Sequence, residues 1–375
     1  MAASSARARQ YNAPMPHPEK RDLALDRRRL EAFLSRARPA AEGLRIADLR
    51  VPSDTGFSSE TLLFEVRWRE GGAPRRERRV ARIEPRGFNV FPVYDLTVQY
   101  RVMDALAKTP VPVPAMAEHD WSDATLGAPF YLMEFLDGWV PPDNPPMHAA
   151  GRIAEELAPA EREQLWWSGV EALCRVHEVD FEALGLSFLA EPERGPDPLA
   201  QQLAYYEDYL AWGLGERGRY PLLRRALAWL RERAPKDEPV ALCWGDSRLA
   251  NQIYSGVECI GVLDWEMVRL GNPLQDAAWW VALDRCFSEG VGLARLAGLP
   301  GRDETLRHWR RRTGRSLDHV DYYEVLALVK FAAIMARLGR QLVHYEILPP
   351  DHDMDVDNLA SATLARKLEE LGVPA

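Results

Sequence analysis

The first third of the chain alternates apolar and polar positions in short runs. Residues 44–85 hold two such runs on either side of Gly-Gly-Ala-Pro, and this pattern predicts an antiparallel hairpin with a Gly/Pro turn. Residues 94–109 repeat apolar positions at helical spacing, and two more strand-like runs follow at 111–120 and 127–138. We therefore predict about five strands and one helix, preceded by an amphipathic helix at 22–38.

The remaining two thirds of the chain follow a helical period. Apolar residues recur at helical spacing in four long stretches, 162–179, 197–214, 220–234 and 322–344. Only the segment 243–266 interrupts them with strand-like character. The predicted fold class is α+β, with a small antiparallel-sheet lobe that contains one helix and a larger, mainly helical lobe.

The predicted boundary between the lobes lies in a proline-rich stretch at 139–146, because prolines break both helices and strands. We predict a flexible basic tail at 1–21, an N-terminal lobe at 22–137 and a C-terminal lobe at 138–375.

Composition narrows the class of protein. The 375 residues are 47% hydrophobic and carry a net charge of −9, and no run approaches the roughly 20 apolar residues of a membrane span. The net charge is uneven: residues 1–38 carry nine Lys or Arg against four acids, so the rest of the chain is acidic, which argues against a nucleic-acid partner. The start has no signal-peptide core, and the four cysteines are widely separated. We expect a cytoplasmic protein with reduced thiols, a monomer or homodimer that binds neither nucleic acid nor membranes.

Three oxygen-bearing side chains, Asp246, Asn251 and Asp264, mark the segment that interrupts the helices. A carboxylate can take the proton of an attacking hydroxyl, while an amide oxygen and a second carboxylate can hold Mg²⁺ on nucleotide phosphates. Protein kinases perform these tasks with the same order of residues: Asp, four residues, Asn, a short hairpin and Asp. Each residue alone could equally form a turn or a helix cap.

Taken together, the segment resembles the aminoglycoside phosphotransferase family. Residues 244–251 match the family's His-Gly-Asp-x-x-x-x-Asn except that Trp244 replaces His. The resemblance extends over roughly 22–370 and is greatest to a branch with mycobacterial proteins designated aminoglycoside phosphotransferases and with the kinase-like domains of acyl-CoA dehydrogenase fusion proteins. It implies a bilobal, protein-kinase-like fold that uses ATP, or alternatively GTP, with Mg²⁺ and a small-molecule hydroxyl acceptor.

The resemblance also assigns roles in the C-terminal lobe. Asp246 would be the catalytic base, and Arg248 would offset charge on the transferred phosphoryl group. Asn251 and Asp264 would be the metal ligands. Asp276, in the stretch that resembles the family's Gly-Asp-Pro sequence and its following Asp, would support the catalytic loop through backbone N–H groups.

In the N-terminal lobe the resemblance implies a nucleotide site. A turn that covers the phosphates would contain Gly56, Ser58, Ser59 and Thr61, because small residues let backbone N–H groups approach phosphate oxygens. The hinge that binds adenine would comprise Met133, Glu134, Phe135 and Leu136. Arg82 stands where kinases carry a phosphate-binding Lys, and Gln99 where its Glu partner is usual, so the Lys–Glu ion pair becomes at best Arg–Gln.

Three functions follow from these residues. The first is an ATP-dependent phosphotransferase that acts on a hydroxyl of an aminoglycoside-like compound, a hydroxyacyl-CoA or another natural product. The second, motivated by Arg82, Gln99 and Trp244, is a nucleotide-binding protein with little or no transfer activity. A metal-dependent hydrolase that uses the same acids ranks last, because it would need neither the hinge nor the phosphate-covering turn.

Overall fold

A computed structural model describes residues 21–52, 60–215 and 220–373. The chain divides into two compact units. The smaller unit comprises the described residues up to 108 together with 113–137, and the larger comprises 109–112 together with 138 onward. Every helix in the described residues falls short of the length and apolarity that a membrane span requires.

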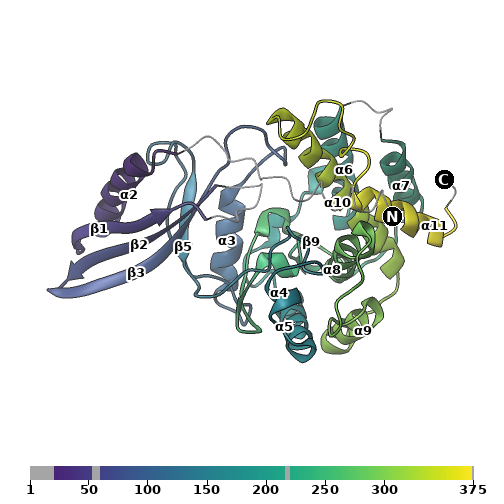
Figure 1. The fold of residues 1–375 in the computed structure, drawn as a ribbon, viewed down its shortest axis with the longest axis horizontal. Coiled ribbons are helices and arrows are strands. Elements are labelled where there is room, and N and C mark those ends of the chain that lie inside the picture. The colour runs from purple at the N-terminus through teal and green to yellow at the C-terminus, as the bar shows by residue number, and fades with distance from the viewer. Residues whose placement is uncertain (1–20, 53–59, 216–219, 374–375) are drawn as a thin grey trace. The chain divides into compact units, whose positions relative to one another are not determined.

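The smaller unit is built on a five-stranded antiparallel sheet of order β1-β2-β3-β5-β4 (Figure 1). Gly71 and Gly72 connect β2 and β3, and both have the positive φ that a tight hairpin turn requires. The predicted hairpin and the count of strands are therefore confirmed. The strands are β1 (Glu42–Arg50), β2 (Glu60–Glu70), β3 (Ala73–Ile83), β4 (Met116–Asp120) and β5 (Phe130–Glu134).

Two helices complete the smaller unit. The first, α2 (Leu23–Ala37), begins at Asp22, whose carboxylate accepts hydrogen bonds from two N–H groups of the first turn. Leu30 and Leu34 of α2 are fully buried in the same apolar core as the inner faces of the strands. The predicted helix after the hairpin is α3 (Leu96–Leu106), so the unit holds the opening helix in addition to the single helix predicted for this lobe.

The larger unit is mainly helical, as the period of its apolar residues predicts. Its core helix is α8 (Leu274–Phe287), which is apolar around most of its circumference and buried along nearly its whole length, and α10 (Val320–His344) packs against it. The other helices are α4 (Arg152–Glu155), α5 (Pro159–Glu178), α6 (Pro198–Leu214), α7 (Pro221–Glu232), α9 (Arg302–Thr313) and α11 (Leu359–Glu370).

Four short strands interrupt these helices. The strands β6 (Ala241–Cys243) and β9 (Arg269–Gly271) pair with each other, and β7 (Gln252–Ser255) and β8 (Glu258–Val262) form a hairpin. The hairpin lies within the strand-like segment 243–266 that the sequence predicts, whereas β9 and most of β6 lie outside it. The loops that join these strands carry the candidate chemistry.

Candidate active site

Two loops of the larger unit bring Asp246, Asn251 and Asp264 into one region. The loop from β6 to β7 contains Asp246 and Asn251, and Asp264 is the second residue after β8. The backbone N–H of Leu263 donates to the carbonyl of Asn251 at 2.9 Å, which joins the ends of the two loops. The hairpin therefore places the amide and the second carboxylate next to each other, as their spacing in the sequence requires.

Asp246 is buried and held through both carboxylate oxygens. The indole Nε1 of Trp279 donates to Asp246 Oδ1 at 2.9 Å, and Asn251 Nδ2 donates to Asp246 Oδ2 at 2.7 Å. Asn251 Nδ2 also lies 3.0 Å from the backbone carbonyl of Asp246. These contacts fix the orientation of the Asp246 carboxylate.

The residue before Asp246 must be glycine. Gly245 has φ +93°, and a Cβ atom at this position would lie 2.1 Å from the carbonyl oxygen of Met267. The loop and the segment after Asp264 therefore pass in backbone contact, which brings the two acids together.

Asp276 supports the loop that contains Asp246 through hydrogen bonds to its backbone, as the resemblance implies. Its carboxylate accepts the backbone N–H of Trp244 at 2.6 Å and that of Gly245 at 3.0 Å. It also lies 3.1 Å from His177 Nε2, and both side chains are fully buried. The predicted supporting role of Asp276 is confirmed.

His177 is a structural residue in a closed network. The indole N–H of Trp309 donates to His177 Nδ1 at 2.9 Å, so the proton of the neutral ring lies on Nε2, which faces Asp276. The chain of contacts runs from α9 through α5 and α8 to the backbone of the loop that contains Asp246. It stabilises a loop conformation that short-range hydrogen bonds alone would not fix.

Trp244, which stands in the place of the family's histidine, is part of the core. Its ring is fully buried and its Nε1 donates to the carbonyl of Leu263 at 2.8 Å, beside Trp265 at 6.0 Å between ring centroids. This hydrogen bond connects the loop that contains Asp246 to Leu263, the residue before Asp264. The indole ring of Trp244, unlike a histidine ring, carries no titratable group.

The donor set suits a nucleotide-bound Mg²⁺ better than a metal that the protein holds alone. Asn251 turns its amide nitrogen toward Asp246, which leaves its oxygen for a metal ion, and Asp264 offers a carboxylate in the next loop. Asp264 has the left-handed conformation, φ 59° and ψ 65°, which is uncommon for residues other than glycine, although Asp48 and Asp237 also have a positive φ. No cluster of three or more His, Cys, Asp or Glu with metal-binding geometry occurs among the described residues, and Mg²⁺ commonly takes only one or two protein ligands besides phosphates and water.

Arg248 is engaged by two carboxylates. Its Nε lies 3.1 Å from the Asp246 carboxylate and its Nη1 forms an ion pair with Asp143. Burial alone would lower the pKa of Arg248, but the charges of Asp143 and Asp246 outweigh it and raise that pKa. Arg248, the cation predicted to contact the transferred phosphoryl group, is therefore paired with Asp246 and Asp143 in this structure.

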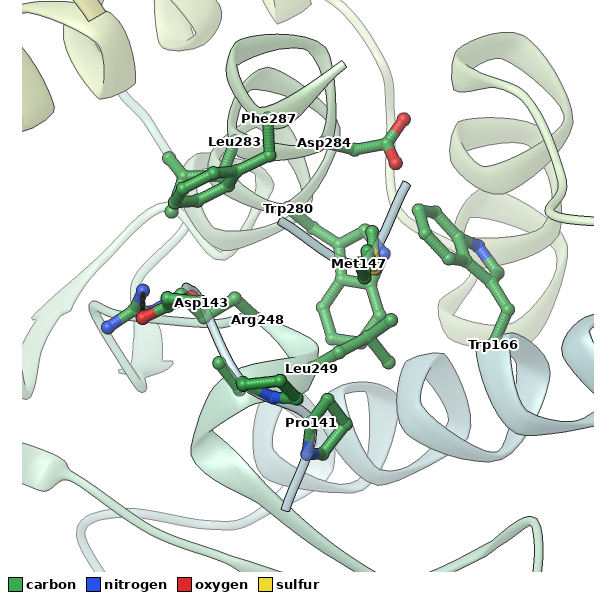
Figure 2. A pocket seen from close by; sticks show the side chains of 12 residues that line it. Pro141, Asp143, Met147, Trp166, Arg248, Leu249, Trp280, Leu283, Asp284 and Phe287 are labelled. Carbon is green, nitrogen blue, oxygen red and sulfur yellow. Dashed lines mark hydrogen bonds and ion pairs between the residues drawn. The ribbon is translucent and has the colours of Figure 1, made fainter. Parts of the chain in front are cut away.

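An apolar cavity borders Arg248 (Figure 2). The Arg248–Asp143 pair lies at one side of it, and the rings of Trp166, Trp280 and Phe287 lie around it with other apolar side chains. Its volume of about 40 Å³ would hold only a few water-sized groups. No pattern in the sequence indicates Asp143 as a partner of Arg248, since Asp143 lies in the proline-rich stretch that is predicted only to join the lobes.

In the smaller unit, the residues predicted to bind phosphate are described only in part. Gly56, Ser58 and Ser59 lie outside the described residues. Thr61 and Arg82 face each other across β2 and β3, with Arg82 Nη1 donating to Thr61 Oγ1 at 3.2 Å. Gln99 is buried and accepts a hydrogen bond from the Tyr131 hydroxyl at 3.3 Å, so it packs as a neutral core residue.

The predicted hinge is the end of β5 and the residues after it. The N–H of Glu134 donates to the carbonyl of Ala115 at 2.9 Å, and that of Phe135 donates to the carbonyl of Arg78 at 3.2 Å. Met133 is buried, whereas Glu134 is exposed and Leu136 is partly exposed. At least two of the backbone donors in 133–136 are thus used within the sheet.

An antiparallel-sheet unit followed by a helical unit, with Asp, Asn and Asp on adjacent loops, defines a kinase-like phosphotransferase. The chain belongs to the phosphotransferase enzyme family known as APH, whose family model matches residues 57–312. A protein of Ralstonia eutropha with the provisional designation aminoglycoside phosphotransferase has the same fold, with a TM-score of 0.66 and 23% identity over 91% of this chain and 98% of that one. The predicted family and fold class are therefore confirmed.

The curated relatives are much longer proteins. Acyl-CoA dehydrogenase family member 10 of Mus musculus is 31% identical over 202 residues, which are 53% of this chain and 18% of the relative. Acyl-CoA dehydrogenase family member 11 of Rattus norvegicus is 26% identical over 366 residues, which are 93% of this chain and 43% of the relative. The chain thus spans less than half the length of these relatives, in agreement with the predicted branch.

Proposed function

We propose that this chain is an ATP-dependent, Mg²⁺-requiring phosphotransferase that moves the γ-phosphoryl group to a hydroxyl of a small molecule. The observation that carries the proposal is the pair of hydrogen bonds from Trp279 and Asn251 that hold Asp246 as a buried, oriented carboxylate. A base in this position takes the acceptor's proton as the phosphoryl group arrives. Asn251 and Asp264 would hold Mg²⁺, whose charge offsets that of the phosphates.

The other predicted roles follow from the same reaction. Thr61 and Arg82 would contact nucleotide phosphates, and the residues around Glu134 would contact the base of ATP or GTP. Arg248 would exchange Asp143 for the transferred phosphoryl group, since a guanidinium favours a multiply charged oxyanion. The relatives among the acyl-CoA dehydrogenase proteins favour a hydroxyacyl-CoA acceptor over an aminoglycoside or another natural product.

The test is acceptor-dependent release of ADP. Purified protein with ATP and Mg²⁺ is assayed against hydroxyacyl-CoA thioesters, aminoglycosides, macrolides and simple alcohols, and the phosphorylated product is identified by mass spectrometry. We expect turnover on one class that is lost in Asp246→Asn. Tight binding of ATP without turnover on any class would instead support the nucleotide-binding function without transfer that Arg82 and Gln99 suggest.

A further inference from the structure

Lys330 is a buried cation that the proposed reaction does not use. It lies in the middle of α10 and its side chain is 2% exposed. Its ammonium nitrogen is 4.8 Å from the ring centroid of Trp279 and 5.8 Å from that of Tyr206. Within the described residues it forms no ion pair and no hydrogen bond, which is rare for a buried lysine.

A second cation lies beside the same tyrosine. Arg269, on β9, places its guanidinium carbon 5.3 Å from the Tyr205 ring centroid and 5.9 Å from that of Tyr206. The Nε of Arg269 and the hydroxyl of Tyr206 are both buried, and neither has a hydrogen-bond partner in the part of the chain that the structure describes. The ring of Tyr206, on α6, thus lies near two cations, Arg269 from β9 and Lys330 from α10.

These groups lie next to the candidate base. Trp279, on whose ring the Lys330 ammonium rests, is the residue that donates to Asp246. Burial raises the pKa of the Tyr206 hydroxyl, and the negative charges of Asp246 and Glu266 act in the same direction. The hydroxyl of Tyr206 therefore keeps its proton at neutral pH and is available as a donor.

The arrangement is costly without a ligand. Burial lowers the pKa of Lys330 to about 7, and the like charge of Arg269 contributes, although Asp276 and Asp246 act in the opposite direction. A buried cation beside the like charge of Arg269, without a carboxylate of the described residues in contact, destabilises the fold. Sites that bind charge are where such costs are retained.

We propose that Lys330, Arg269 and the hydroxyl of Tyr206 form a subsite for an anionic group, a carboxylate or a phosphate, on the acceptor whose hydroxyl Asp246 activates. The inference rests on the proposed function and names the chemistry of its substrate. An anion here gives both cations a partner and accepts a hydrogen bond from Tyr206, and it fixes the acceptor beside the base. The same charges disfavour a polycationic aminoglycoside, because they repel its ammonium groups.

A binding experiment tests the subsite without any transfer. With ADP and Mg²⁺ present to fill the nucleotide site, inorganic phosphate and acetate are titrated in separate calorimetric experiments. We compare the wild type with Lys330→Met, with Lys330→Arg, which keeps the charge, and with Lys236→Met, which removes an exposed lysine elsewhere. Binding of one probe should weaken at least about tenfold in Lys330→Met alone, the loss expected for one charged hydrogen bond.

The identity of the probe that binds distinguishes a carboxylate from a phosphate. Absence of binding of both probes to the wild type, or equal binding to Lys330→Met, would overturn the subsite. If Lys330→Met does not fold, Arg269→Gln takes its place in the same titration, with the same expectation.

A kinetic experiment ties the subsite to the substrate. Acceptors are assayed in matched pairs with and without an anionic group, such as glycerol phosphate with glycerol and pantothenate with pantothenol. We expect the ratio of kcat/KM for the anionic over the neutral member to fall at least about tenfold in Lys330→Met and to recover in Lys330→Arg. A ratio that does not change contradicts the subsite while leaving the phosphotransferase intact. Probe binding without turnover on any acceptor contradicts the phosphotransferase while leaving the subsite intact.

Discussion

Two regions around Asp246 differ in whether their cationic side chains are paired with carboxylates. In one, Arg248 is shared between Asp246 and Asp143 beside an apolar cavity. In the other region, Lys330 and Arg269 pack against aromatic rings and no carboxylate of the described residues contacts them. A paired cation is stable at rest and must exchange partners to act, whereas an unpaired one is destabilising until a ligand arrives. On the two proposals, the larger unit binds negative charge at two points. Arg248 contacts the transferred phosphoryl group only during the reaction, whereas Lys330 and Arg269 hold the anionic group of the acceptor throughout.

The largest effect is expected at the base that both regions share. Asp246→Asn removes the proton acceptor but keeps a side chain of the same shape, so kcat should fall by about 10²- to 10⁴-fold. Steady-state ADP release measures this, with the melting temperature as a check on folding. An Asp246→Asn enzyme that turned over at the wild-type rate would remove the role given to Asp246 and with it the meaning of the comparison.

The next effect concerns the support of the loop. Asp276→Asn replaces an acceptor of two backbone N–H groups and His177 by a side chain that presents its own N–H to one of those donors. We expect a loss of about 3 kcal/mol in the free energy of unfolding, measured with urea, and a fall in kcat.

A matched control lies on the same helix. Asp284 is also buried, and its carboxylate contacts His148 and Arg295 instead of the backbone N–H groups of the loop. Asp284→Asn should therefore destabilise the protein without changing kcat. Equal losses of kcat in both variants would show that Asp276 acts on global stability only.

The unpaired region should appear in the pH dependence of stability. Because the pKa of Lys330 is lowered in the folded state to about 7 from 10.5, the unfolded chain binds more protons between these values. This side chain therefore makes the free energy of unfolding rise with pH from about 7 to 10.5. Lys330→Met should remove this rise, a difference on the order of a few kcal/mol across the window. Urea titrations of the two proteins at several pH values measure it, and parallel curves would contradict a buried, unpaired Lys330.

The smallest effect is expected in the paired region. Asp143 is 40% exposed at its side chain, so Asp143→Asn should cost under about 1 kcal/mol in stability. It should raise kcat by up to about fivefold, because Arg248 then leaves its resting partner more easily. A loss of tenfold or more would mean instead that Asp143 positions Arg248 for catalysis.

The sequence predicted what depends on local pattern. The turn at Gly71 and Gly72 and the long helices follow from the spacing of apolar residues, and the adjacency of Asp246 and Asn251 follows from a separation of five residues. Asp276 was assigned to the loop only through the order of motifs in the family. The residues that complete the site are distant along the chain, such as Trp279, 33 residues after Asp246, and Asp143, 105 residues before Arg248.

Lys330 is an intermediate case. It stands in an almost wholly apolar stretch of α10, and a single charge at a core position of a buried helix is a conflict that the sequence displays. The sequence could therefore have indicated a buried lysine, but the rings and cations around it come from α6, α8 and β9, and only the tertiary structure brings these together.

The network around Asp276 also sets how the loop opens to solvent. The amide protons of Trp244 and Gly245 point at a fully buried carboxylate on α8, which His177 and Trp309 hold in turn. They can exchange with deuterium only when the loop separates from α8, a motion that breaks contacts reaching to α5 and α9. These two amides should therefore exchange as slowly as the core of α8, although they sit immediately before the residue that must meet a substrate.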